Sequence, residues 1–397
     1  MYGRLSGLTC AISLVLLSAL QWAGAQTIKT GIVKIGSDWE ISGNFVGSGL
    51  PAATGVRMAV KEINDKGGFT VGDTHYTLQL VEVDNQSTSA SAVSGITKLV
   101  EDEKAKFVFG PIMGALAAQT AEIAASAKAI AFSPGGTWQT KGYLTDPRTP
   151  LLFGTQISLS RLEKLDVTAL KELGAHKVAY ISLDDDTTKA NLSAFREAIK
   201  GSDITVNPIL FPPGTSDFSS YVTRAKGDGA DAVYFLYPHD LTADLLRATV
   251  DLGVAPKGFG ARATDPGVAV KGVNGKPLPF PFFSSFNTPS IEYPVGDKVL
   301  AFRDRLRAFA PSLSGPNQSS VLLSYDFVYM LVEAMKRAGT VEDTAKIGNE
   351  LGTLTYDGVD GRMCFPDGIR NIVLDTELIW VRDGKVQPQI VPSDCKG

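Results

Sequence analysis

Cysteine and histidine are scarce in this chain of 397 residues, which contains three of each. The sequence also lacks an H-E-x-x-H segment, a C-x-x-C pair, a G-x-S-x-G turn and a glycine-rich phosphate loop ending in Lys and Ser or Thr. These absences argue against zinc hydrolases, thiol oxidoreductases, serine hydrolases and nucleotide hydrolases. We therefore predict that the chain is not an enzyme and needs no cofactor.

Runs of basic residues are absent too, and the formal net charge is −4. A surface of this kind does not favour binding to nucleic acid or to an anionic membrane. The one long apolar run, Leu8–Leu20, is too short to span a membrane. It lies between Arg4 and the small-residue segment Ala23-Gly24-Ala25, which is the pattern of a cleaved signal peptide. We therefore expect residues 1–25 to be removed on export. The alternative, an uncleaved anchor, does not fit the A-x-A ending.

Removal of residues 1–25 takes away Cys10 and leaves Cys364 and Cys395. In an oxidising exported compartment, two cysteines most simply form one disulfide bond, which here ties the C-terminal tail back to an earlier segment. Two free thiols are the alternative.

Strand and helix patterns alternate along most of the remaining chain. Gly31–Gly36 is a predicted strand, the loop Ser37–Gly49 follows it, and the helix through Thr54–Asn64 is predicted to end at Gly67-Gly68. The same alternation restarts at Leu162, which predicts an α/β fold with parallel sheets in two lobes. Near the end, Asp383-Gly384 predicts a hairpin turn between two antiparallel strands.

Ligands of parallel sheets meet the loops at the carboxyl ends of the strands. Four such loops are rich in glycine, hydroxyl groups and aromatic rings, a composition that suits small polar ligands. Asp184-Asp185-Asp186 could suggest calcium, but the alternating spacing of calcium ligands is missing, so we expect no metal. Gly47-Ser48-Gly49 lacks the third glycine of a dinucleotide-binding turn. The four loops are 37–49, 110–115, 133–138 and 183–188.

Several of these segments resemble the periplasmic binding proteins of branched-chain amino acid (Leu/Ile/Val) transporters. The resemblance rests on Ser42–Gly49, Thr54-Gly55, Lys66-Gly67-Gly68, Asp84 after the second strand, Gly110 after the third, Ser133-Pro134 after the fourth, and Leu245-Leu246-Arg247. It implies a type I periplasmic binding protein, with two Rossmann-like lobes, three hinge crossovers and a ligand in the cleft between them. Lobe 1 would comprise residues 26–156 and 286–354, and lobe 2 residues 157–285 and 355–397.

The resemblance also implies a function. Such receptors are monomers of the periplasm that carry a solute to a membrane permease driven by ATPase subunits, without inserting into the membrane themselves. The same fold also serves as a sensor that reports ligand occupancy to a membrane signalling partner, and this alternative stays open. An exported enzyme is the third alternative, which the shortage of nucleophile–base pairs disfavours.

The residues that hold an amino acid in the family are only partly present. The serine expected after the third strand is replaced by Gly114, next to Ala115. After the fourth strand, Thr137 is retained, with Ser133 and Gly135 beside it.

On the second lobe, Thr187-Thr188 replaces an aromatic–glycine pair, and Arg262 falls where the family has an acid. A guanidinium there would repel an ammonium group and bind a carboxylate in a bidentate pair. The alternatives are a surface arginine or one paired with Asp265.

Aromatic residues near the four loops complete the predicted site. Trp39, Phe45, Trp138 and Tyr237 are candidates for packing against a ligand, although such residues more often belong to the core. His239 could also lie near the cleft, and a position on the surface at a helix start is its alternative. We predict a ligand with a carboxylate and an apolar or aromatic body, or an amino-acid-like compound.

Overall fold

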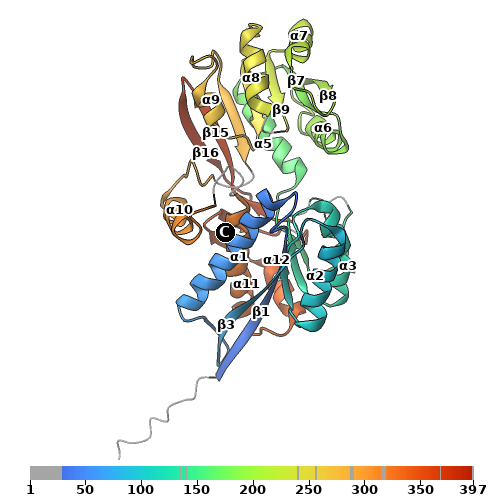
Figure 1. Ribbon diagram of the computed structural model, residues 1–397, viewed down its shortest axis with the longest axis vertical. Helices are drawn as coiled ribbons and strands as arrows, with labels where there is room; N and C mark the ends of the chain where they lie inside the picture. The colour runs from blue at the N-terminus through green and yellow to red at the C-terminus, as the bar shows by residue number, and fades with distance from the viewer. Residues whose placement is uncertain are drawn as a thin grey trace, which may run out of the picture.

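The computed structural model describes residues 29–134, 136, 138, 141–238, 241–254, 257–286, 290–313, 319–366 and 368–395. These residues form two α/β lobes, one below the other in Figure 1. In these ranges no helix has both the length and the apolar character needed to cross a membrane. Residues 1–25 lie outside the described residues, so removal of a signal peptide stays a prediction.

Lobe 1, as we define it, is built on a six-stranded sheet in the order β2-β3-β1-β4-β5-β6. All neighbouring strands are parallel except β2 and β3. Side chains alternate across the sheet: Phe107 and Phe109 pack with α1, α10, α11 and α12, whereas Val108 packs with α2 and α3. Strands and helices of this lobe are β1 (Lys29–Trp39), β2 (Phe69–Val71), β3 (Thr74–Asp84), β4 (Phe107–Phe109), β5 (Ile130–Ser133), β6 (Leu152–Gly154), α1 (Val46–Asp65), α2 (Ser89–Thr97, continued by a π-helical turn at Lys98–Asp102), α3 (Gly114–Ser126), α10 (Asp297–Phe309), α11 (Ser319–Ala338) and α12 (Thr344–Thr353).

Lobe 2 is built on a seven-stranded sheet in the order β16-β15-β11-β10-β9-β7-β8. Helices α5 and α6 cover one face and α7 to α9 the other. The predicted hairpin is present: Asp383 and Gly384 both have positive φ between antiparallel strands. Its elements are α5 (Leu159–Glu172), β7 (Lys177–Leu183), α6 (Asp186–Ala198), β8 (Thr205–Phe211), α7 (Ser219–Gly227), β9 (Ala232–Phe235), α8 (Thr242–Asp251), β10 (Gly258–Arg262), α9 (Gly267–Lys271), β11 (Phe282–Phe286), β15 (Thr376–Arg382) and β16 (Lys385–Val391).

A small antiparallel sheet, β12 (Thr355–Gly358), β13 (Gly361–Cys364) and β14 (Val373–Leu374), follows α12. Its apolar residues Met363, Phe365 and Leu374 belong to the hydrophobic core of lobe 1. After α12, the chain returns to the sheet of lobe 2 only at Thr376, where β15 begins. We therefore propose that the last lobe boundary lies near Asp375 rather than after residue 354.

The segment from β1 to α1 is more regular than its sequence suggests. β1 extends to Trp39, and α1 begins at Val46, eight positions before Thr54. Gly55 lies where a side chain would collide with the carbonyl oxygen of Val321, so its lack of a Cβ lets α1 pack closely on α11. The predicted end of the helix is confirmed, because Gly67 and Gly68 both have a φ of +93°.

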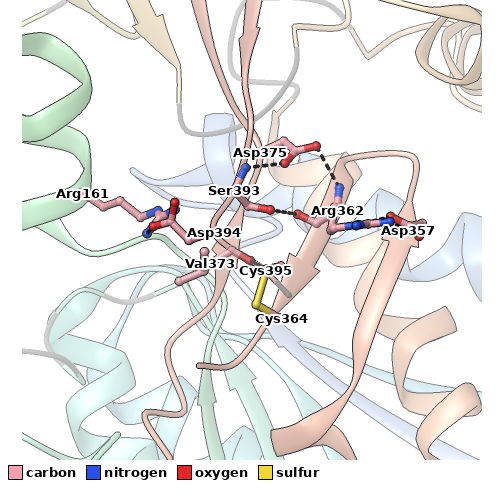
Figure 2. The surroundings of a disulfide bond; sticks show 9 residues. All are labelled: Arg161, Asp357, Arg362, Cys364, Val373, Asp375, Ser393, Asp394 and Cys395. Atoms are coloured by element: carbon pink, nitrogen blue, oxygen red, sulfur yellow. Dashed lines mark hydrogen bonds and ion pairs between the residues drawn. A yellow bond between two sulfur atoms is a disulfide. The ribbon is translucent and has the colours of Figure 1, made fainter. Parts of the chain in front are cut away.

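The C-terminal tail returns from lobe 2 to the small sheet of lobe 1. Cys395 forms the predicted disulfide bond with Cys364, which closes a separation of 31 residues (Figure 2). Just before it, the Ser393 backbone N–H donates to Asp375 at 2.7 Å, and the Ser393 hydroxyl donates to the Arg362 carbonyl oxygen. Asp394 pairs with Arg161 of α5 at 2.9 Å. The tail is thus a further connection between the lobes, held at both ends.

Loss of this disulfide should destabilise the protein. A Cys395→Ser variant should lose roughly 3–4 kcal/mol of unfolding free energy, because the bridge restricts the unfolded chain. Urea unfolding with and without dithiothreitol measures the effect. Reductant should destabilise the wild type to the level of the variant and leave the variant unchanged. Two free thiols in denatured, unreduced wild-type protein lacking residues 1–25 would contradict the bond.

Candidate ligand-binding cleft

A cleft of about 810 Å³ lies between the two lobes. Lobe 1 contributes Phe45, just before α1, and Gly136, beyond the end of β5. The other lining residues come from the connection into α5, the start of α6 and the carboxyl ends of β9 and β10, as expected for a parallel sheet. They are Gln156, Ile157, Leu159, Leu162, Asp186, Thr187, Ala190, Asn191, Leu236, Tyr237 and Arg262.

Arg262 forms the charged floor of the cleft on lobe 2. It ends β10, in which Phe259 and Ala261 face the opposite side, so its side chain lies toward α5 and α6. Its guanidinium donates to Asp166 through Nε and Nη2, and Nη1 donates to Asn191 Oδ1 at 2.7 Å. The second N–H of Nη1 has no acceptor among the described residues.

Two buried acids of α5 face this guanidinium. Asp166 also accepts a hydrogen bond of 2.6 Å from the Tyr234 hydroxyl. Glu163 Oε1 lies 2.9 Å from Nη2 of Arg262, yet neither oxygen of Glu163 accepts a hydrogen bond from the described residues. Burial raises the pKa of Glu163 to about 8 against the opposing charge of Arg262, and Asp166 raises it further. Burial therefore favours the protonated form of Glu163.

Tyr237 stands at the rim of the cleft beside the start of α6. Asp185 caps this helix by accepting the Thr188 backbone N–H at 2.8 Å, and it also accepts the Tyr237 hydroxyl. Burial, assisted by the hydrogen bond to Asp185, raises the pKa of Tyr237 to about 12. The ring is thus held as a neutral phenol whose position is fixed by the helix cap.

The corresponding helix start on lobe 1 is already occupied by a side chain. Glu40 is fully buried, and its carboxylate accepts the backbone N–H groups of Ile112 and Met113 just before α3. Burial nevertheless raises the pKa of Glu40, against the lowering effect of these two hydrogen bonds. This chain therefore supplies its own carboxylate at a helix start where the family resemblance predicts a ligand contact.

The predicted site residues divide into distinct groups. Phe45, Thr187, Tyr237 and Arg262 line the cleft together. Trp39 is 2% exposed within the lobe 1 core, and Ser133 is fully buried with its hydroxyl donating to the Pro111 carbonyl oxygen.

Other candidates lie away from the lining or outside the described residues. Trp138, a further aromatic candidate, belongs to the core cluster beneath α2 and α3, and its indole N–H donates to the Ala117 carbonyl oxygen. Gly114 and the exposed Ala115 begin α3 and are not among the lining residues. Gly135, Thr137 and His239 lie outside the described residues. Arg262 pairs with the α5 acids, whereas Asp265 accepts from Gly267 and Tyr293.

Sequence reasoning missed the acids that hold Arg262. Glu163 and Asp166 are three residues apart on α5, and both are fully buried on the face that carries Leu162 and Leu165. Acids within the apolar stripe of a helix signal a buried partner of opposite charge, and this signal was available in the sequence. Asn191, which orients Nη1, carries no comparable signal. Among the described residues, no three acidic, histidine or cysteine side chains gather to hold a metal ion.

Comparison with known proteins agrees with this geometry. The sequence model of the family described as periplasmic binding protein matches residues 32–370. The chain is a periplasmic binding protein. The family predicted from the sequence and its type I fold are thereby confirmed, and membership identifies a binding protein rather than an enzyme.

Relatives of this binding protein have related names and folds. The Leu/Ile/Val-binding protein homolog 3 of Brucella melitensis is 25% identical over 364 residues, covering 87% of this chain and 93% of that one. Among solved structures, the branched-chain amino acid substrate-binding protein LivJ of Streptococcus pneumoniae, in complex with isoleucine, superimposes with a TM-score of 0.69 at 24% sequence identity. The match covers 91% of this chain and 100% of LivJ. A solute-binding protein of R. palustris, solved in complex with benzoate, gives a TM-score of 0.68 at 17% sequence identity. This match covers 92% of this chain and 98% of the R. palustris protein.

The buried Glu163 should make the stability of the binding protein depend on pH. Its pKa is raised from 4.5 to about 8, so the folded state binds the extra proton between these values, and stability falls as pH rises through this range. Glu163→Gln removes this dependence. The unfolding free energy of the variant relative to the wild type should rise by about 1 kcal/mol per pH unit between pH 5 and 8.

Urea unfolding at a series of pH values measures this difference. Glu172→Gln, which removes an exposed acid from the same helix, is the matched control. A constant difference between Glu163→Gln and wild type would show that Glu163 is ionised in the folded protein.

Proposed function

We propose that this protein is the periplasmic receptor of an ABC importer and that it binds a small carboxylate-bearing solute, such as an amino-acid-like or aromatic acid, in the cleft between its lobes. The cleft supports this assignment because both lobes contribute to its lining. A ligand that contacts both lobes favours their closure around it, and the closed receptor then delivers the ligand to a membrane permease. The observation that carries the proposal is the arginine on the floor of this cleft.

The ligand carboxylate would contact Arg262 through one hydrogen bond, whereas the sequence predicts a bidentate pair. A bidentate pair needs two parallel N–H groups, but Asp166 already accepts from Nε and Nη2. The N–H of Nη1 that has no acceptor among the described residues remains for the ligand. We therefore propose a single charge-assisted hydrogen bond to the carboxylate, in a site where Phe45 and Tyr237 face the body of the ligand.

The remaining lining supports an apolar or aromatic ligand body. Ile157, Leu159, Leu162 and Leu236 give the cleft an aliphatic wall, and Phe45 is 40% exposed at its lobe 1 side. An exposed ring at a cleft gains free energy by packing against an apolar ligand. The branched-chain amino acids and benzoate that relatives are named or solved with share a carboxylate and an apolar body.

A thermal-shift screen across amino acids, aromatic acids, dicarboxylates and amides tests this ligand class. Aromatic or branched aliphatic monocarboxylates should give the largest rise in melting temperature, because binding to the folded state alone stabilises it. The corresponding amide of each active acid is the matched control and should give a smaller shift. Equal shifts from acid and amide would contradict recognition of the carboxylate.

Arg262→Lys should weaken binding of the best acid from this screen by about 1–3 kcal/mol, because an ammonium group cannot satisfy Asp166 and the ligand with the same geometry. Isothermal titration calorimetry measures the change. Arg382→Lys is the matched control, since Arg382 also lies on lobe 2 but pairs with Glu172 outside the cleft lining. Unchanged affinity in Arg262→Lys would remove Arg262 from the site.

A further inference from the structure

The charges beneath the cleft floor do not balance if every acid is ionised. Glu163 and Asp166 lie against one cation, Arg262, and both carboxyl groups are fully buried. Two carboxylates facing a single guanidinium leave one negative charge in a region of low polarity, which is costly unless a proton or another cation neutralises it.

Among the described residues, the surroundings of Glu163 contain no other cation to do so. The charged or titratable groups around it are Asp166 on its own helix, Arg262 of β10, Tyr180 of β7 and Tyr234 of β9. Both tyrosines stay neutral, since burial raises the pKa of each above its usual value. From α6, the neighbour of Arg262 is the neutral amide of Asn191. Among the described groups, a proton on Glu163 is thus what balances the cluster.

The two acids differ in their hydrogen bonds, which identifies the one that carries the proton. Asp166 Oδ2 accepts from both Arg262 and Tyr234, whereas Glu163 Oε1 faces only Nη2 of Arg262, at 2.9 Å, and Glu163 Oε2 has no hydrogen-bond partner among the described residues. The ionised form of Glu163 is therefore the less stabilised of the two. The proton therefore belongs on Glu163.

We propose that Glu163 sets the charge of the cleft floor, so that a carboxylate ligand binds to this receptor only together with a proton on Glu163. This inference rests on the proposed function, because it concerns the same ligand contact at Arg262. With Glu163 protonated, Asp166 and Arg262 cancel, and a ligand carboxylate adds one negative charge. With Glu163 ionised, the ligand would add a second negative charge to a floor that already carries one.

The sign of the pH dependence follows from this arrangement. Burial raises the pKa of Glu163 to about 8 before ligand binds, and a bound carboxylate raises it further. Below pH 8 the proton is present in both states, so affinity is constant. Above pH 8 the free receptor has lost the proton and must take it up on binding. Affinity should then fall by about tenfold per pH unit until the pKa of the bound state is reached.

Calorimetric titration with benzoate from pH 6.5 to 9.5, in buffers of different ionisation enthalpy, tests the proposal. Benzoate keeps its charge over this range, so the receptor alone determines the pH profile. Wild-type affinity should be constant to pH 8 and then fall, with uptake of up to one proton per bound benzoate. In Glu163→Gln the fall above pH 8 and the proton uptake should both disappear.

Glu377→Gln is the matched control. Glu377 is another fully buried acid whose pKa burial raises to about 8, but it accepts a backbone hydrogen bond from Ser290 and does not line the cleft. This variant should retain the wild-type pH profile. Circular dichroism at each pH confirms that the variants are folded.

Four results would overturn the proposal, and they separate it from the proposed function. Tight benzoate binding that is independent of pH, or a fall that persists in Glu163→Gln, rejects the role of Glu163 and leaves the receptor function standing. Benzylamine binding that strengthens with pH would show that a cationic ligand neutralises the acids. Absence of benzoate binding at every pH rejects the proton linkage together with this ligand class.

Discussion

The ion pair between Arg262 and Asp166 is the interaction on which the cleft face of lobe 2 depends. It joins the carboxyl end of β10 to α5, and through Asn191 it reaches α6. Because both partners are buried, removing either one would leave an uncompensated charge inside the lobe. Arg262, the residue that we propose as the ligand contact, is therefore also a structural residue, and its buried partners hold the guanidinium in one orientation.

Preorganisation of this kind distinguishes the two sides of the cleft. On lobe 2, Arg262 and Tyr237 are each held by a carboxylate of a neighbouring helix or helix cap. On lobe 1, the carboxylate of Glu40 occupies the backbone N–H groups before α3, and Phe45 is left exposed at the cleft. The polar contacts thus lie mainly on one lobe and the aromatic surface on the other, an arrangement that suits a ligand with a charged end and an apolar body.

The region where the lobes meet contains more than the expected crossovers. The chain passes from lobe 1 to α5 after β6, and again from β14 into β15. The tail after Val391 then returns to lobe 1, where Cys395 is bonded to Cys364 and Asp394 pairs with α5. The tail is therefore a further connection between the lobes, and the disulfide fixes its end to lobe 1.

Local patterns in the sequence were enough to predict the alternating strands and helices, the helix end at Gly67-Gly68 and the Asp383-Gly384 hairpin. Each of these features depends on residues that are neighbours along the chain. The disulfide followed from the count of cysteines. The predicted start of α1 was wrong, because the helix begins at Val46 and already buries Gly49 and residues 51–53. Trp39 and Ser133 are residue types that often line binding sites, yet both are buried. Successive side chains at the end of a strand point to opposite faces of the sheet, so some of them enter the core.

The sequence by itself determined the family and the two-lobed α/β architecture, since both follow from residue types at set spacings, and it also singled out Arg262 as a predicted ligand contact. Only the tertiary structure decided what that arginine does. Asp166 is separated from Arg262 by 96 positions in the chain, and Glu163 precedes Asp166 on the same helix. Only the packing of α5 on the sheet places these acids in contact with the arginine. Charge balance is a property of groups close in space, so the chemistry of the cleft floor appears only after the chain has folded.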